Sequence, residues 1–126
     1  MQARSRSIKV LDHAMSGSAG TACCETFVEA LGLKHLFATF MGTGKSKKLA
    51  KTLPEDTSHT LGIVSSLFTN LASDTPARIR LLAKFVENTY EKTDKVLEIR
   101  DAAQVRLKQV EKEIEDEKKV RLRACE

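Results

Sequence analysis

One glycine-rich stretch of the sequence has residue types that could bind phosphate: Gly42-Thr43-Gly44-Lys45-Ser46. Its Gly-Lys-Ser end matches the end of a P-loop, in which backbone N–H groups and a lysine hold nucleotide phosphates. The full pattern needs a glycine five residues before Gly44, and that position holds Thr39. An amphipathic helix rather than a strand is expected before it. We therefore interpret the stretch as part of a loop and predict no nucleotide and no other cofactor.

Lysines gather in the same loop, at positions 45, 47, 48 and 51. Such a cluster could contact RNA phosphates or serve as a nuclear-localisation patch. The formal net charge is +4, however, and residues 91–126 sum to zero, so the sequence predicts no long basic stripe. We interpret the lysines as a solvated loop and do not expect direct nucleic-acid binding. A basic RNA-binding helical protein is the least favoured of our alternatives.

The three cysteines do not form a metal-binding or disulfide pattern. Cys23 and Cys24 are adjacent and would point about 100° apart on a helix, so they cannot face one metal together. An odd number of cysteines without C-x-x-C spacing favours a reducing compartment. We expect Cys24 to be buried and Cys23 to be half-exposed. We predict no metal site and no catalytic residues, and we expect the protein not to be an enzyme.

Asn70 is the best candidate for a functional polar residue. It lies within an otherwise apolar helical pattern, and an asparagine in such a position often hydrogen-bonds the backbone of a partner. The alternative is a local bond to the preceding turn or to the next loop. We predict that Asn70 contacts a partner protein.

The helix that carries Asn70 is expected to lie at the centre of the fold. Apolar residues recur with helical period in residues 60–71, and the apolar arc is too broad for a surface helix. We therefore expect neighbours on two sides. Gly62 should let another helix approach closely. The helix is predicted to run from Pro54 to about Ser73.

Shorter helices are predicted around it. The first covers residues 4–15 and ends at a turn over 16–20. The second begins near Thr21, as a possible N-cap, and carries Cys24, Phe27, Val28 and Leu31. Gly32 should end it. A third helix follows over residues 33–41 and is closed by Gly42, before the main loop of residues 42–55.

A fifth helix should start at Asp74-Thr75-Pro76, a cap-and-proline signal. We expect Ile79, Leu82 and Val86 on its packed face, with Leu81 and Phe85 beside them. The predicted connection of two or three residues indicates that this helix and the central helix form an antiparallel pair.

Residues 90–122 contain neither proline nor glycine and read as one long charged helix. Its apolar seam has steps of 3, 4, 4, 3 and 4, close to a heptad pattern, and runs through Val96, Ile99, Ala103, Leu107, Val110 and Ile114. The end beyond Ile114 should be solvated and frayed. This seam supports our main alternative, a self-associating helical or coiled-coil module that forms a homo-oligomer.

The composition agrees with an all-α fold: no Trp, one Tyr and two Pro leave little material for strands. We predict helical repeats over residues 1–89 and the long helix over 90–126. No apolar run is long enough to span a membrane, so we expect no membrane association.

Much of the chain resembles the beta-catenin-like family associated with the spliceosome. An apolar run ending in Leu-x-Asn-Leu-Ala, as at Leu67–Ala72, resembles the third-helix signature of armadillo repeats. The further matching stretches are Val10–Met15, Phe27–Leu33, Ile63–Leu71, Arg80–Phe85, Glu87-Asn88, Glu91–Lys95 and Glu113–Lys118. The similarity covers roughly residues 8–119, and it makes Lys84 and Asn88 further partner-binding candidates.

The resemblance implies an armadillo/HEAT-like right-handed helical solenoid and a nuclear, non-enzymatic scaffold. It also implies binding to basic nuclear-localisation segments of splicing factors, with partners in the NineTeen complex. Family members are several times longer, so the resemblance implies that this chain is a partial segment. An isolated piece of a solenoid should leave apolar surface exposed.

Overall fold

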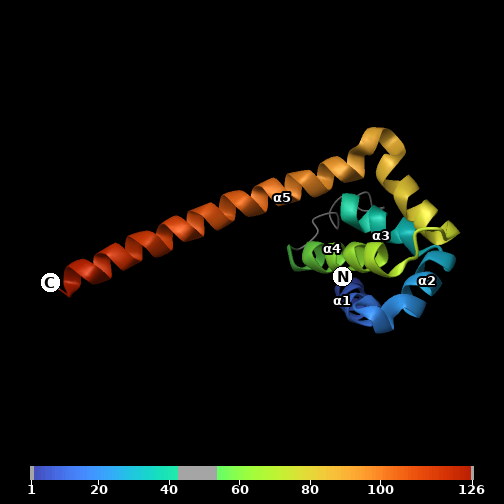
Figure 1. Ribbon diagram of the computed structural model, residues 1–126, viewed down its shortest axis with the longest axis horizontal. Coiled ribbons are helices and arrows are strands. Elements are labelled where there is room, and N and C mark those ends of the chain that lie inside the picture. The colour runs from blue at the N-terminus through green and yellow to red at the C-terminus, as the bar shows by residue number, and fades with distance from the viewer. Residues whose placement is uncertain (1, 43–53, 126) are drawn as a thin grey trace. The chain divides into compact units, whose positions relative to one another are not determined.

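The computed structural model describes residues 2–42 and 54–125, and these residues form helices without a strand (Figure 1). The elements in chain order are α1 (Gln2–Met15), the short 3-10 helix η1 (Ser18–Gly20), α2 (Thr21–Glu29), α3 (Gly32–Met41), α4 (Pro54–Asn70) and α5 (Pro76–Ala124). The predicted all-α class is confirmed. Within the described ranges no helix is long and apolar enough to cross a membrane.

The chain divides into two compact units, Met1–Lys92 and Thr93–Glu126. The lysine cluster of the loop and all of the glycine-rich stretch except Gly42 fall in residues 43–53, outside the described residues, so our interpretation of them stays a prediction.

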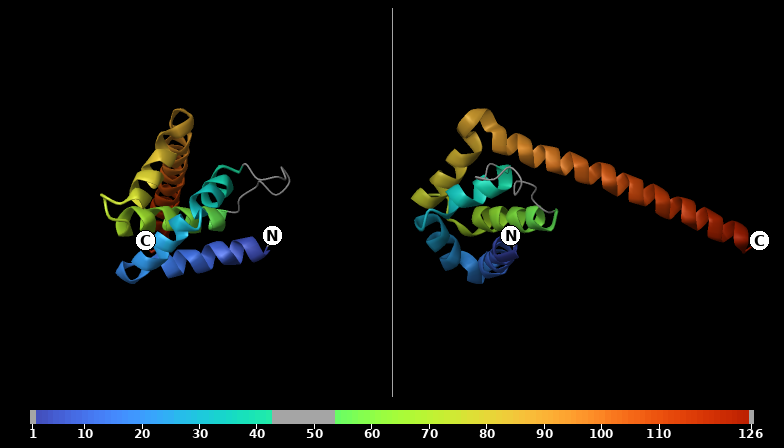
Figure 2. Two further views of the ribbon diagram at one scale, coloured as in Figure 1. Left: turned by 90° about the vertical axis from the view of Figure 1, so that its right-hand side faces the viewer. Right: turned by 180° about the vertical axis from the view of Figure 1, so that it is seen from behind.

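The predicted central helix is the core of the first unit. α4 lies between α1 and α3 in the views of Figures 1 and 2 and contacts both. Its fully or nearly buried side chains are Thr60, Ile63, Val64, Leu67 and Leu71. A Cβ on Gly62 would come within 2.4 Å of Oδ1 of Asp12, so the expected close approach of a neighbouring helix is confirmed.

α1 and α2 contribute further side chains to this core, and α3 adds Leu33, Leu36, Phe37 and Phe40. The buried side chains of α1 and α2 are Ile8, Met15, Cys24 and Val28. The predicted N-cap of α2 is wrong by one residue: Gly20 holds that position, without a side-chain cap. The hydroxyl of Thr21 instead donates to the carbonyl oxygen of Ser18, 3.0 Å away.

The turn between α2 and α3 differs from the prediction. Leu31 has a left-handed backbone (φ 63°) and is 59% exposed, so it does not belong to the packed face of α2. Gly32 begins α3 rather than ending α2. A Cβ on Gly32 would come within 2.6 Å of the Phe27 ring, so there is no space for a side chain at this position. The left-handed backbone conformation occurs at the preceding residue, Leu31.

The connection from α4 to α5 is longer than predicted. α4 ends at Asn70 and α5 begins at Pro76, which leaves residues 71–75 between them. The N–H of Arg78 donates to the Thr75 hydroxyl (3.4 Å), so Thr75 caps α5. The guanidinium of Arg78 also donates to the carbonyl oxygens of Phe68 and Leu71, which ties the start of α5 to the end of α4.

The packed face of α5 is not the predicted one. Leu81 is fully buried, and the ring of Phe85 contacts Phe37 and Phe68 at centroid distances of 5.4 and 5.3 Å. The residues predicted to be packed are exposed instead: Ile79, Leu82 and Val86. Both sides of this helix are apolar, and the period alone does not say which side meets α3 and α4. This side of α5 therefore leaves apolar surface exposed.

The second unit is the remainder of α5. Its helix is unbroken to Ala124, and every described residue from Arg100 onward is exposed. The fraying predicted for its end stays a prediction.

Candidate partner-binding surface

α5 bends at Glu87–Tyr90, where the predicted long helix was expected to begin. Glu87 is extended (ψ 157°), and three successive residues without a glycine are left-handed, with φ of 53°, 59° and 63° at Asn88, Thr89 and Tyr90. Each left-handed non-glycine residue costs about 1–2 kcal/mol. Surrounding contacts must therefore hold the bend in place.

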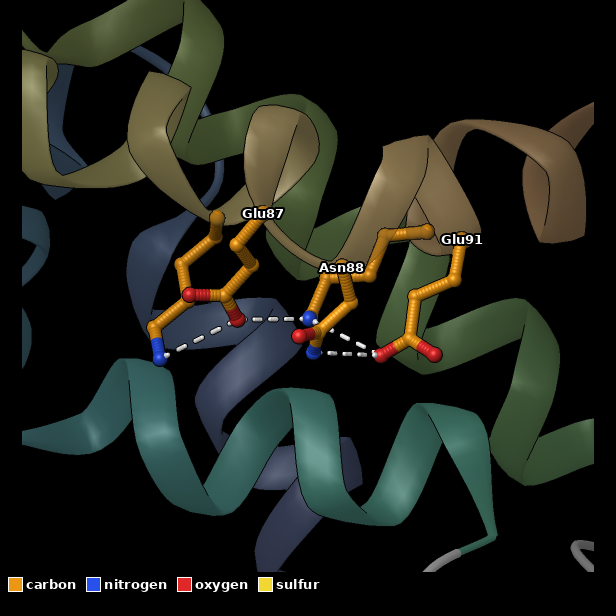
Figure 3. Close-up of polar contacts among 5 residues, drawn as sticks. Glu87, Asn88 and Glu91 are labelled. Atoms are coloured by element: carbon orange, nitrogen blue, oxygen red, sulfur yellow. Dashed lines mark hydrogen bonds and ion pairs between the residues drawn. The ribbon is translucent and has the colours of Figure 1, made fainter.

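Five polar side chains around the bend supply such contacts, and we call them the bend cluster: Lys84, Glu87, Asn88, Glu91 and Lys92. Nζ of Lys92 lies 2.7 Å from Oε1 of Glu87 and 3.5 Å from Oε1 of Glu91. Lys84 approaches the same oxygen of Glu87 at 3.6 Å. The amide of Asn88 donates to Oε1 of Glu91 at 3.1 Å (Figure 3).

Lys92 is the buried centre of the bend cluster, with a residue exposure of 4%. Its ammonium lies 5.7 Å from the centroid of the Phe37 ring on α3, within cation–π range. A buried lysine needs paired charge to offset its lost hydration, and the two glutamates provide it. Lys92 thereby connects the bend to the aromatic contacts of α3.

The hydrogen bond from Lys92 lowers the pKa of Glu87, and the charge of Lys84 adds to the effect. A lowered pKa in the folded state means that this pair stabilises the fold above the ordinary glutamate pKa. That stabilisation is lost as the pH falls through the lowered value. The bend is therefore held by charge at neutral pH.

The two glutamates of the bend cluster are accessible at its surface. The side chains of Glu87 and Glu91 are 39% and 43% exposed, whereas that of Lys92 is 5% exposed. Carboxylates in this state can accept hydrogen bonds from a Lys or Arg side chain of a partner. The structure thus brings two predicted residues, Lys84 and Asn88, to one pair of glutamates.

Asn70 lies elsewhere, at the junction of α4 with α1. Its amide nitrogen donates to the carbonyl oxygens of Met15 and Gly17, both at 2.9 Å, and lies 3.7 Å from Sγ of Cys24. These bonds secure the turn between α1 and η1. The geometry matches the local alternative that we weighed for Asn70, and its contact with a partner stays a prediction.

Cys24 is buried as predicted, and Cys23 is exposed. Burial raises the pKa of the Cys24 thiol. The thiol faces the carbonyl oxygens of Met15 (3.6 Å) and Ser66 (3.8 Å). A neutral thiol between carbonyls is a poor nucleophile, so Cys24 is a core residue.

Sequence reasoning missed the polar pairs that join α1 to α4. Nδ1 of His59 lies 2.8 Å from Oδ2 of Asp12, and the Ser5 hydroxyl donates to Asp56 at 2.8 Å. The partners are far apart in sequence, so spacing gave no signal for them. Within residues 2–42 and 54–125, no three His, Cys, Asp or Glu side chains gather to hold a metal ion.

The first unit stacks short helices, with α4 in contact with both α1 and α3, and stacked helices of this kind are typical of helical repeat proteins. Residues 1–124 match the family described as "Catenin-beta-like, Arm-motif containing nuclear". The chain belongs to this family, and its fold is a helical solenoid of the armadillo type.

Relatives named beta-catenin-like protein 1 support this assignment. The chain is 44% identical to the protein of Bos taurus over 118 residues and 42% identical to that of Homo sapiens over 116 residues, covering 90% and 91% of this chain. A homolog from Schizosaccharomyces pombe is 39% identical over 110 residues, or 87% of this chain. The chain spans about a fifth of the length of each relative: 21% of the Bos taurus protein, 20% of the Homo sapiens protein and 18% of the Schizosaccharomyces pombe homolog.

Proposed function

We propose that the chain is a protein-binding segment of an armadillo-type scaffold. The observation that carries this proposal is the family match over residues 1–124. Armadillo-type solenoids stack helices into extended surfaces that bind other proteins. The exposed apolar side of α5 and the bend cluster are surfaces of that kind, since both leave side chains accessible on a helical framework. We propose no enzymatic activity for it.

The finer proposal concerns the partner. By the resemblance of the sequence, the partners are splicing factors of the NineTeen complex, bound through their basic nuclear-localisation segments in the nucleus. The accessible carboxylates of Glu87 and Glu91 fit a basic peptide in charge. Asn88 and Lys84 are the residues that position those carboxylates.

Fluorescence anisotropy with a labelled basic peptide tests this function. The probe is a nuclear-localisation segment of a splicing factor, and an acidic peptide of equal length is the control ligand. The basic peptide should bind, and Glu91→Gln should weaken it roughly threefold to tenfold because one charge-assisted contact is lost. Glu98→Gln, at an exposed site in the second unit, is the matched control and should bind normally.

A full-length relative serves as the positive control. If the relative binds the basic peptide and this chain does not, the binding function belongs to other parts of the relatives. Equal binding of both peptides, or equal effects of the two substitutions, would remove the bend cluster from the proposal. Circular dichroism of each variant confirms that its helices are intact.

A further inference from the structure

The seam of the second unit has an 11-residue repeat rather than a heptad. Three apolar residues, Val96, Ile99 and Ala103, are each followed eleven residues later by another apolar residue, at Leu107, Val110 and Ile114. Eleven residues make three turns, or 3.67 residues per turn, which is close to the period of a straight α-helix. The apolar side chains therefore form a nearly straight stripe along the helix, which we call the 96–114 stripe.

The outer part of the 96–114 stripe is uncovered within its unit. Leu107, Val110 and Ile114 are 57%, 49% and 48% exposed, and Ala103 is also exposed. A single helix cannot bury its own stripe, and isolated helices depend on tertiary packing for most of their stability. The stripe is therefore shaped for another helix.

We infer that the 96–114 stripe packs antiparallel against the same stripe of a second copy of this chain. Side-chain size favours this direction. An antiparallel pair centred near residue 105 places Ala103 opposite Leu107 of the second copy and Val96 opposite its Ile114. A parallel pair would instead place the two Ala103 side chains together and leave a gap between the helices.

Charge favours the same direction. Arg100 and Glu111 are one 11-residue repeat apart, so they lie on one flank of the stripe. In an antiparallel pair this flank lies against the same flank of the second copy. Arg100 of each copy then approaches Glu111 of the other, which gives two such contacts. In a parallel pair this flank would meet the opposite flank of the second copy, where Arg100 would approach Lys95, a residue of like charge.

The single chain leaves these charges available. Arg100 pairs with its neighbour Asp101 at 3.2 Å, and both side chains are more than half exposed, at 61% and 64%. Exposed pairs of this kind contribute little and exchange readily. The centre of the antiparallel pair brings Arg106 close to its own copy, which is a repulsive contact and limits the affinity.

This surface is independent of the proposed peptide binding, because it lies on the second unit and not on the bend cluster. Sedimentation equilibrium of the full chain across a wide concentration range tests it. The chain should change from monomer to dimer as its concentration rises. Leu107→Glu should abolish the dimer. Val105→Glu adds the same charge about 200° away on the helix, at a side chain that is 65% exposed, and should leave it intact.

Three further variants test the direction. Arg100→Glu should weaken the dimer roughly fivefold, since both exposed pairs become repulsive, and the double variant R100E/E111R should restore it. Arg106→Gln should strengthen the dimer. A parallel dimer would instead be strengthened by Arg100→Glu. The inference is overturned if the chain remains a monomer throughout, if Leu107→Glu has no effect, or if Arg100→Glu strengthens association.

Discussion

Asn70 illustrates how one side chain can be assigned opposite roles before and after its neighbours are known. In the sequence it is a polar residue in an apolar pattern, which favours a partner contact. In the structure its amide nitrogen is bonded to two carbonyl oxygens of the α1–η1 turn. One of these carbonyl groups belongs to the last residue of α1 and the other to the turn after it, where helix carbonyls have no partner within the helix. The bonds therefore stabilise the fold whether or not a partner is present.

The structure predicts that Asn70→Ala destabilises the first unit. The substitution leaves the carbonyl oxygens of Met15 and Gly17 without this donor, at a cost of about 1–3 kcal/mol in the free energy of unfolding. Chemical denaturation followed by circular dichroism measures the change. Ser65→Ala, at an exposed position of the same helix, is the matched control and should stay within about 0.5 kcal/mol of the parent. An unchanged midpoint for Asn70→Ala would contradict the structural role.

At the scale of the element, the bend in α5 shows a limit of local propensity. Glu87–Tyr90 contains no proline or glycine, and its residues could continue a helix. The ion pair of Lys92 with Glu87 and the contact of its ammonium with Phe37 favour the bent form instead. Tertiary contacts therefore outweigh the cost of three left-handed residues.

The bend predicts an unusual response to glycine. Thr89 is β-branched and has φ 59°, so Thr89→Gly should relieve strain and raise the free energy of unfolding by about 1 kcal/mol. Ala83→Gly lies in the regular part of α5 and should lower it by about 1 kcal/mol. Denaturant titrations of both variants measure these changes. If the segment were a continuous helix in solution, both glycines would be destabilising.

The choice of which side of α5 is buried also depends on tertiary contacts. Its period identified an apolar helix, but Ile79, Leu82 and Val86 were assigned to the wrong side. Leu81, offset by part of a turn, is fully buried, and the ring of Phe85 contacts those of Phe37 on α3 and Phe68 on α4. Which of two apolar sides is buried depends on where the neighbouring helices lie.

At the scale of the whole molecule, the two units differ in what stabilises them. The first has a shared core built around α4, with Ile63 and Leu67 fully buried. The second is a single helix whose described residues from Arg100 onward are all exposed. A helix without tertiary packing opens locally far more often than one inside a core.

Hydrogen exchange should reveal this difference directly. In a dilute sample, in which the chain is a monomer, amides of residues 100–124 should exchange about a hundredfold faster than those of residues 63–67. Mass spectrometry of peptide fragments measures both regions in one sample. At high protein concentration the antiparallel pair should slow exchange over residues 96–114. Equal protection of the two regions in dilute solution would contradict the division into a cored unit and an uncovered helix.

The sequence by itself determined the helical class, the central position of α4, the close approach at Gly62 and the burial of Cys24. These follow from local periodicity and residue volume, which act over one or two turns. The tertiary structure decided the buried side of α5, the bend held by Lys92 and the bonds of Asn70. Each of these depends on groups from distant parts of the chain, as when Asn70 meets the turn after α1, and short-range spacing does not encode such meetings.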